Sequence, residues 1–283
     1  MIVVTGATGN VGRPLVRALT GAGERVTAVS RAATPPALPA GVRHVPADLF
    51  RPETLKPAVD GATALFLLVS GAGAGLNIDD ILDVAKAGGV ERIVLLSSQA
   101  VGTRPESLSY APLRAIEDAI ARSGLVWTVL RSAGHASNAF AWAGSIQSER
   151  TVAAPFGDVG LPVVDPADLA EGAATVLRDD RHGGRTYELT GPAPVTPRIQ
   201  TTAIAAALGE PIRFVDLTRD EARARMLRFM PEPVVDGTLA ILGTPTDAEQ
   251  RVSPHVAELL GRTPGAFADW ALRNAAAFRS EEL

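Results

Sequence analysis

Near the N-terminus, three glycines follow one another at intervals of three residues. Gly6, Gly9 and Gly12 come after the apolar run at 2–4 and before the helical pattern at 15–19. A strand that turns through glycines into a helix presents bare backbone N–H groups and the positive end of the helix dipole, which attract a pyrophosphate. Gly6 would make the tight turn, Gly9 would admit the phosphates and Gly12 would let the helix pack on the strand. The pattern predicts a dinucleotide site; an ordinary glycine-rich turn is the alternative.

The residues after the second apolar run bear on which dinucleotide is bound. An acidic residue at this point would accept hydrogen bonds from the ribose 2′-hydroxyl of NAD, but the positions hold Ser30 and Arg31. A guanidinium is always charged and binds phosphate through two hydrogen bonds, so it suits the 2′-phosphate of NADP. We therefore expect NADPH as the cofactor. The alternative is a surface arginine that stacks on the adenine.

The expected dinucleotide contacts lie in the glycine loop and at the ends of the apolar runs. One of them, Asp48, is either an acceptor for the adenine edge or the cap of a turn. The full set is Gly6, Thr8, Gly9, Asn10, Val11, Gly12, Ser30, Arg31, Asp48, Leu49, Val69 and Ser70.

Regular alternation of apolar runs and helical patterns is what would position these residues. Such alternation predicts a parallel sheet covered by helices on both faces, that is, a Rossmann-type doubly wound α/β fold. The ligand crevice then lies beyond the carboxyl ends of the strands. The strands are predicted at 26–29, 42–45, 64–69, 92–96 and 126–130, and the helices near 11–22, 76–88 and 109–123.

After about residue 135 this rhythm breaks into segments punctuated by glycine and proline. We assign 1–135 to the NADP-binding domain, and we expect a helix and a strand near 166–190 to return to it. Residues 136–164 and 191–283 form a smaller substrate-binding lobe with a loop-rich first part. Helices in the second part are predicted near 197–208, 218–228 and 253–278.

Composition excludes several classes of function. The 283 residues are 46% hydrophobic and 20% charged, enough for one large core or a core plus a smaller lobe. A net charge of -4 without a Lys/Arg run argues against nucleic acid or an anionic membrane as partner. No apolar stretch reaches the ~20 residues of a membrane span, and the first strand cannot also be a cleaved signal, so we expect a cytoplasmic protein. Nothing in the composition fixes an oligomeric state.

The supply of reactive side chains narrows the chemistry further. The sequence has no cysteine, which excludes disulfides, thiolate nucleophiles and cysteine metal sites. Its four histidines are far apart and have no ligand spacing, so we expect no metal. Asp165 and Asp168 flank Pro166, a pattern typical of a helix cap and first turn; a paired-carboxylate site is the alternative.

Several segments together resemble the NmrA-like, atypical branch of the short-chain dehydrogenase/reductase superfamily. The resemblance covers nearly the whole chain. It implies an NAD(P)H-dependent quinone, azo-type or ketone reductase, or a redox-sensing regulator that binds the nucleotide without turning it over. The segments are TGATGNVG at 5–12, GVERIV at 89–94 followed by Ser97 and Ser98, SGLVWTVLR at 123–131, Asn138, VVDPADLA at 163–170, YELTGP at 187–192 and Leu208-Gly209.

The superfamily's usual catalytic pair is a tyrosine proton donor with a lysine four residues later. Tyr110 and Arg114 form a similar YxxxR pattern. Alignment of this helix on Glu117, however, places the usual positions at Ser109 and Leu113. A shift of one residue turns a side chain by about 100° on a helix. We therefore expect Tyr110 not to be the proton donor, and Arg114 to pair with Glu117.

The resemblance leaves two serines and one histidine as catalytic candidates. Ser97 and Ser98 end a central strand beside the expected nicotinamide and can hydrogen-bond a substrate oxygen. His135 lies in the loop where the family's substrate pocket begins, and histidine can act as an acid near neutrality. The alternatives are strand-end hydrogen bonding for the serines and a polar loop role for the histidine.

We expect an NADPH-dependent reductase that transfers hydride to a quinone or ketone carbonyl of a small aromatic molecule. A quinone becomes a delocalised anion and needs little acid, which agrees with the missing pair. A plain ketone becomes a basic alkoxide and needs a donor, unless a neighbouring hydroxyl of the substrate supplies the proton, as in aromatic polyketides. The alternative is a non-catalytic NADP(H)-sensing regulator or scaffold of the NmrA type.

Overall fold

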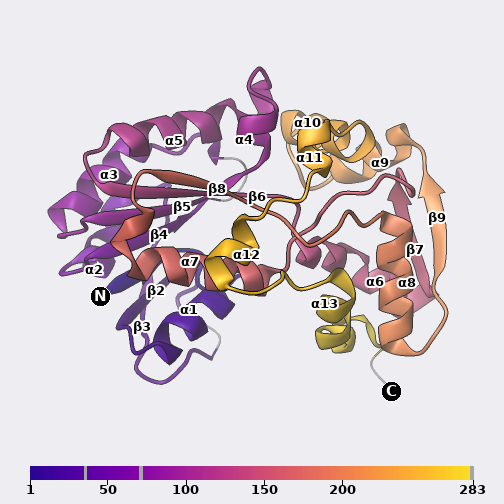
Figure 1. The fold of residues 1–283 in the computed structure, drawn as a ribbon, viewed down its shortest axis with the longest axis horizontal. Helices are drawn as coiled ribbons and strands as arrows, with labels where there is room; N and C mark the ends of the chain where they lie inside the picture. Colours follow the sequence, from indigo (N-terminus) through magenta and orange to yellow (C-terminus); the bar gives the residue numbers. More distant parts are fainter. Residues whose placement is uncertain (35–36, 70–72, 281–283) are drawn as a thin grey trace.

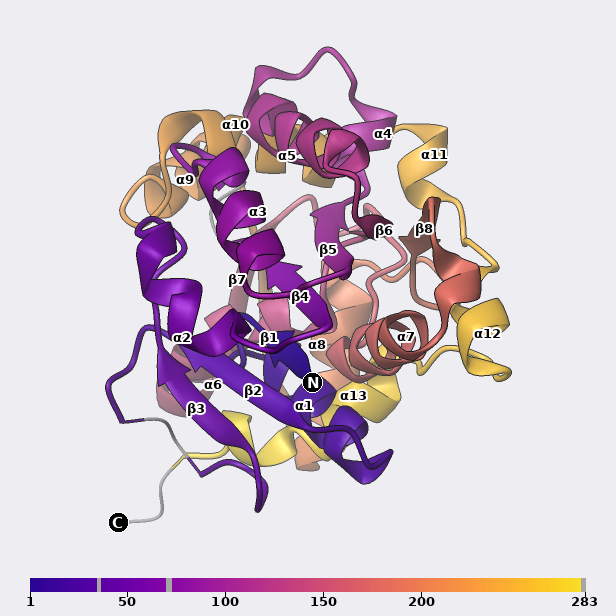
Figure 2. The ribbon, with the colours of Figure 1, turned by 90° about the vertical axis from the view of Figure 1, so that its left-hand side faces the viewer.

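The computed structural model describes residues 1–34, 37–69 and 73–280. Seven parallel strands form one sheet in the order β3-β2-β1-β4-β5-β6-β8, with helices on both faces (Figures 1 and 2). The predicted Rossmann-type α/β class is confirmed. The strands are β1 (Ile2–Val4), β2 (Val26–Ser30), β3 (Arg43–Pro46), β4 (Ala64–Leu68), β5 (Arg92–Ser98), β6 (Val126–Ser132) and β8 (Arg185–Leu189).

The strands read as continuous apolar runs because both of their faces are buried. In β1, Val4 packs toward α1 (Gly12–Gly21), α7 (Pro166–Arg178) and α12 (His255–Leu260). Its neighbour Val3 packs toward the opposite layer, since successive side chains of a strand point to opposite faces. That layer consists of α2 (Lys56–Val59), α3 (Ile78–Ala87) and α5 (Ala111–Arg122).

The strand order reverses between β1 and β4, which are neighbours in the sheet. Such a switch point leaves a crevice at the carboxyl ends of the strands, because the following connections run to opposite faces. The Thr5 side chain ties the two strands together there: its hydroxyl donates to the Phe66 carbonyl at 3.1 Å and accepts from the Leu68 N–H at 2.8 Å. The loop 6–11 starts from this tied position.

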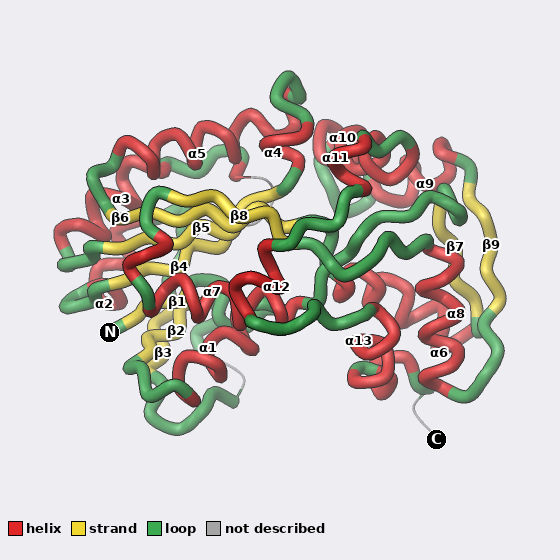
Figure 3. The backbone as a smooth tube through the Cα atoms, viewed as in Figure 1, coloured by secondary structure: helices red, strands yellow, loops and turns green. Residues whose placement is uncertain are grey.

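A second lobe stands beyond the carboxyl ends of the strands (Figure 3). Its two-stranded parallel sheet pairs β7 (Thr151–Pro155) with β9 (Arg213–Leu217). An aromatic cluster lies in the core of this lobe, with the Phe140 ring 5.0 Å from that of Trp270 and 5.8 Å from that of Phe278. The helices that pack with this cluster are α6 (Ala143–Glu149), α8 (Pro197–Leu208) and α13 (Phe267–Arg273). Helices α9 (Arg219–Met226) and α10 (Glu232–Gly243) share a smaller apolar cluster, and α11 (Asp247–Gln250) follows them.

The chain passes back and forth between these two parts. It leaves the large sheet after β6, returns for α7 and β8, and leaves again for the segment α8 to α11. It then returns for α12, which packs against α7 and β8, before α13 packs against α8 in the lobe. Figure 1 shows the yellow C-terminal helices on both sides of this boundary.

The lobe contains regular elements that the sequence pattern did not predict. Residues 136–164, predicted as loop-rich, hold α6 and β7. Helix α10 begins right after Pro231 and carries Pro233 in its first turn, where proline is tolerated because that N–H has no intrahelical partner. The single helix predicted at 253–278 is divided after α12 by Gly261, whose φ of +65° ends the helix.

Asp165 caps α7, as predicted: its carboxylate accepts from the Ala167 N–H at 2.9 Å. The same carboxylate pairs with Arg273 of α13. Asp168, one turn later, accepts from Arg262 at 2.8 Å and from the Gly265 N–H at 2.7 Å. These two acids therefore fasten the C-terminal segment to the sheet domain.

Candidate functional site

The glycine loop has a backbone that only glycine allows at two of its positions. Gly6 has a φ of +62°, which L-residues rarely adopt. A Cβ at Gly12 would stand 2.1 Å from the Gly6 carbonyl oxygen, far inside van der Waals contact. Gly9 closes the loop by donating its N–H to the same carbonyl at 3.0 Å. The first turn of α1 is thus held directly against the end of β1.

The open side of this loop is suited to a pyrophosphate. Helix α1 begins at Gly12 and has no acidic residue in its first turn. Within the described residues, the backbone N–H groups of Asn10 and Val11 have no protein acceptor. Unpaired N–H groups at the positive end of a helix dipole bind phosphate oxygens. The loop therefore fits the dinucleotide that the sequence predicts.

The adenosine end of the site lies at the ends of β2 and β3. Ser30 shares a hydrogen bond of 2.9 Å with the His44 ring. Arg31 is exposed at the edge of the cleft and makes no ion pair with a described residue. The Asp48 carboxylate accepts from the Phe50 N–H at 3.1 Å, so it does cap a turn. Ser70, another predicted contact, lies outside the described residues.

A cleft of about 1550 Å³ runs from the glycine loop into the second lobe. It brings together the cofactor contacts predicted in the glycine loop and those predicted at the ends of the strands. Gly12 does not line the cleft, because it packs beneath the loop. Catalytic candidates Ser97, Ser98 and His135 also line this cleft. The predicted cofactor contacts on its walls are Gly6, Thr8, Gly9, Asn10, Val11, Ser30, Arg31, Asp48, Leu49 and Val69.

Ser97 is part of a buried polar network. Its hydroxyl donates to a Glu117 carboxylate oxygen at 2.5 Å, and that carboxylate pairs with Arg131 at 2.6 Å. The serine hydrogen is therefore already engaged. Ser98, the next residue, accepts from the Ala100 N–H at 3.2 Å, and its own hydrogen has no acceptor among the described residues. Ser98 is thus the serine with a hydrogen left for a substrate oxygen.

His135 is held in one tautomer by the adjacent strand ends. Ser132, which pairs with Ser98 in the sheet register, donates its hydroxyl hydrogen to the Ser97 carbonyl at 3.2 Å. The hydroxyl oxygen must then accept from His135 Nε2, 3.0 Å away. Burial lowers the pKa of His135 to about 4. The ring is therefore neutral near pH 7, with Nδ1 as an acceptor, and is not an imidazolium acid.

The two residues of the YxxxR pattern, Tyr110 and Arg114, lie in different environments. Arg114 donates to the Ser107 carbonyl at 3.3 Å, so the predicted pairing with Glu117 is wrong; that carboxylate has Arg131 instead. Tyr110 precedes α5 and lines the cleft. Burial raises its pKa, and the Glu249 carboxylate raises it further against the opposing effect of Arg104. A phenol of raised pKa is a weaker acid.

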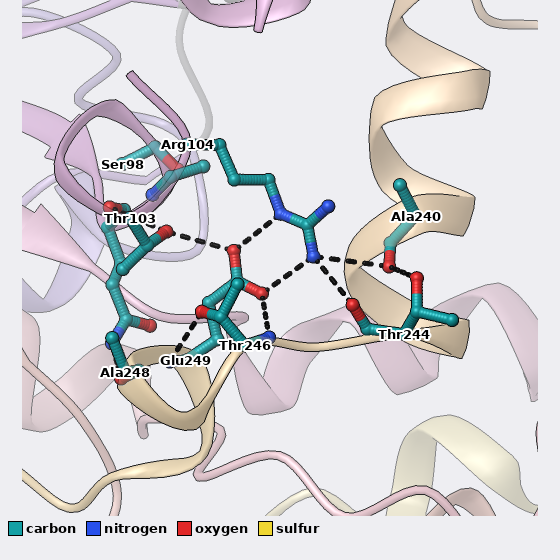
Figure 4. Close-up of polar contacts among 10 residues, drawn as sticks. Ser98, Thr103, Arg104, Ala240, Thr244, Thr246, Ala248 and Glu249 are labelled. Carbon is teal, nitrogen blue, oxygen red and sulfur yellow. Dashed lines mark hydrogen bonds and ion pairs between the residues drawn. The ribbon is translucent and has the colours of Figure 1, made fainter. Parts of the chain in front are cut away.

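A buried ion pair joins the two parts of the molecule beside this tyrosine (Figure 4). Arg104, at the end of α4 (Ala100–Thr103), donates to both carboxylate oxygens of Glu249 in α11, at 2.7 and 2.8 Å. It also donates to the Thr244 carbonyl at 2.9 Å. The Glu249 side chain is 2% exposed and also accepts from the Thr103 hydroxyl and the Thr246 N–H. We call this group the clamp; a sequence gives no local signal for it.

Over residues 1–34, 37–69 and 73–280, no helix combines the length and apolar character of a bilayer span. The same residues hold no group of three or more potential ligands that could bind a metal ion.

A doubly wound sheet with a glycine loop at its switch point, opening into a second lobe, defines a dinucleotide-binding protein. The chain belongs to the NAD(P)H-binding family, whose model matches residues 6–180. The predicted nicotinamide dinucleotide and the predicted resemblance are confirmed.

Two curated relatives that span nearly the whole chain are named as reductases. It is 35% identical, over 99% of its length and 100% of the relative's, to a (4-alkanoyl-5-oxo-2,5-dihydrofuran-3-yl)methyl phosphate reductase of Streptomyces griseus. It is 29% identical to an NAD(P)H azoreductase of Xenophilus azovorans, over 98% of this chain and 99% of the relative. The chain thus belongs to a family of NAD(P)H-dependent reductases.

Solved structures share the whole fold. The quinone oxidoreductase QOR2 of Escherichia coli, in complex with NADPH, aligns with a TM-score of 0.78 at 23% identity, over 96% of this chain and 99% of that one. The negative transcriptional regulator NmrA aligns with a TM-score of 0.71 at 18% identity, over 96% and 94%. At these identities the likeness extends to the fold alone.

Proposed function

We propose that the protein is an NADPH-dependent reductase that transfers hydride to a quinone or ketone carbonyl of an aromatic substrate. The observation that carries the proposal is the makeup of the cleft between the cofactor loop and the lobe. Ser98 and His135 face it, while the superfamily's usual catalytic positions are occupied otherwise. Ser109 donates to the Pro233 carbonyl at 2.6 Å, and Leu113 is buried.

Acceptors that delocalise charge suit such a cleft. Bound NADPH supplies the hydride. A quinone that receives hydride becomes a phenolate-like anion, which needs no strong acid in the protein. The relatives' names describe acceptors of the same kind: an azo group, and a ring double bond conjugated with two carbonyl groups. This shared electronic character supports a conjugated acceptor over a plain ketone.

Five residues of the cleft then have a definite role. The N–H groups of Asn10 and Val11 hold the pyrophosphate, and Arg31 holds the 2′-phosphate. Ser98 donates a hydrogen bond to the acceptor oxygen. Neutral His135 accepts at Nδ1, which orients a substrate hydroxyl or a water. The product oxygen takes its proton from that hydroxyl or from water.

Steady-state oxidation of NADPH tests this proposal, with menadione as the quinone and an aryl ketone bearing a neighbouring hydroxyl as the ketone. Ser98→Ala and His135→Ala should each slow the ketone more than the quinone, because only the ketone generates a basic oxyanion. Equal losses on both would mean that these residues bind without assisting proton transfer. Tight NADPH binding with no turnover of either acceptor would overturn the proposal and favour a nucleotide-sensing regulator.

A further inference from the structure

The cleft extends past Ser98 and His135 into the lobe, where one face of α9 forms its wall. Ala222, Arg225, Met226 and Phe229 all line it. Their spacing of i, i+3, i+4 and i+7 defines a single face of a helix and its following turn. Arg225 is the charged member of that face.

The other residues at this end of the cleft are mostly apolar. Met226 and Met230, two of the three methionines in the sequence, lie here with Leu217 and Val234. Methionine side chains are flexible and polarisable, so they adapt to apolar groups of different shape. This end of the cleft is therefore a chamber for an apolar part of a ligand.

Arg225 differs from its neighbour on the other side of α9. Arg223 pairs with Asp236 at 2.8 Å and also with Glu232. The Arg225 side chain makes no ion pair or hydrogen bond with a described residue. Glu221, one turn before it, is engaged in the helix cap, where it accepts from the Thr218 N–H and hydroxyl at 2.8 Å each. Glu221 lies near enough for the charge of Arg225 to help lower the pKa of its carboxyl group, but one of its carboxylate oxygens is bound in the cap. The Arg225 guanidinium thus borders the apolar chamber without an ion-pair contact to any described residue.

We infer that Arg225 selects acceptors that carry a negatively charged substituent beside an apolar body. A guanidinium presents paired N–H donors that match the oxygens of a carboxylate, sulfonate or phosphate. The apolar chamber would receive the body of the same molecule, and its burial would strengthen the ion pair by removing water. The inference rests on the proposed function and deepens it by naming the substrate class.

Two naphthoquinones that differ only in a sulfonate group test the inference. Wild type should show a KM for naphthoquinone sulfonate about tenfold below that for naphthoquinone, the scale of one charge-assisted contact at a partly exposed site. Arg225→Ala and Arg225→Gln should remove this preference, so that the ratio of the two KM values approaches one. Arg228→Ala is the matched control, because Arg228 is exposed near the same helix end but does not line the cleft. Added salt should raise the sulfonate KM in wild type and not in Arg225→Ala.

Failure of this inference can be separated from failure of the proposed function. Turnover of both quinones with the same KM ratio in wild type and in Arg225→Ala would overturn the role of Arg225 alone. Absence of turnover would overturn the proposed function, and equilibrium binding would then decide the inference. Trp142 lines the cleft, so quenching of tryptophan fluorescence reports binding of either quinone. Equal affinities of NADPH-bound wild type for the two quinones would overturn the inference.

Discussion

One end of the cleft is built mainly from backbone atoms and the other mainly from side chains. The cofactor end consists largely of backbone: the N–H groups of Asn10 and Val11, and the close contact between Gly12 and the Gly6 carbonyl. The lobe end consists of side chains, and the clamp between Arg104 and Glu249 fixes it to the sheet domain. Backbone geometry follows from a local sequence, whereas the lobe depends on contacts made after the chain has folded back. Substitutions at the two ends should therefore have different effects on stability and on cofactor binding.

Loss of the clamp, at the lobe end, should have the largest effect on the free energy of unfolding. Glu249→Ala leaves Arg104 without its partner, and removal of one member of a buried pair costs about 3–5 kcal/mol in free energy of unfolding. Urea denaturation would measure this change. Glu258→Ala is the control: Glu258 is exposed and makes no ion pair with a described residue, so it should change stability by less than about 0.5 kcal/mol. An equal loss in both variants would contradict the importance of the clamp.

The clamp should also weaken in acid. Burial raises the pKa of Glu249, but the hydrogen bonds from Arg104, the Thr246 N–H and Thr103 outweigh it, so the pKa lies below its ordinary value of 4.5. The clamp's contribution is then complete above the unfolded-state pKa and is lost as the pH falls through the folded-state pKa. The stability difference between wild type and Glu249→Gln should shrink over that interval. A difference that is independent of pH would contradict this.

Gly12→Ala should damage the cofactor end. A Cβ 2.1 Å from the Gly6 carbonyl oxygen forces α1 away from β1, at a cost of about 3 kcal/mol for such overpacking, and displaces the N–H groups that hold phosphate. NADPH titration and thermal unfolding measure the two effects. In Gly21→Ala, at the other end of α1, the new Cβ meets nothing within 4 Å, so NADPH affinity should be unchanged. If Gly12→Ala bound NADPH as tightly as wild type, the loop would tolerate the displacement of α1.

The choice between the two nicotinamide cofactors should depend on Arg31. Arg31→Ala should weaken NADPH binding by about 1.5–3 kcal/mol, the value of a hydrogen bond to a charged group, and leave NADH binding unchanged. Arg25→Ala, at the opposite end of the β2 segment, should alter neither. Equal affinities of wild type for the two cofactors would exclude a 2′-phosphate contact.

The smallest effect is expected for Tyr110→Phe. Tyr110 lies between the two ends of the cleft. Loss of a hydroxyl of raised pKa should change kcat for a quinone by less than about threefold, because a general acid contributes about a hundredfold or more. A fall of that size in turnover would make Tyr110 the proton donor after all.

Sequence reasoning predicted one of these ends much better than the other. The sheet and the glycine loop could be predicted because apolar strands and glycine turns are local patterns. The clamp could not, because Arg104 and Glu249 are separated by 145 residues. The pairing predicted for Arg114 was wrong since Arg131, from the adjacent strand β6, is the partner of Glu117. Arg225 was overlooked, although its helical spacing with Ala222 and Phe229 was present in the sequence.

The path of the chain between the two parts affects how such a protein can change through descent. The segments that form the lobe are separated by α7, β8 and α12, which belong to the sheet domain. A recombination event that replaced the lobe alone would need several simultaneous breakpoints, because the lobe is not one continuous segment of the gene. Substitutions within the separate lobe segments can change the substrate preference without any breakpoint, and they leave the phosphate-binding loop intact.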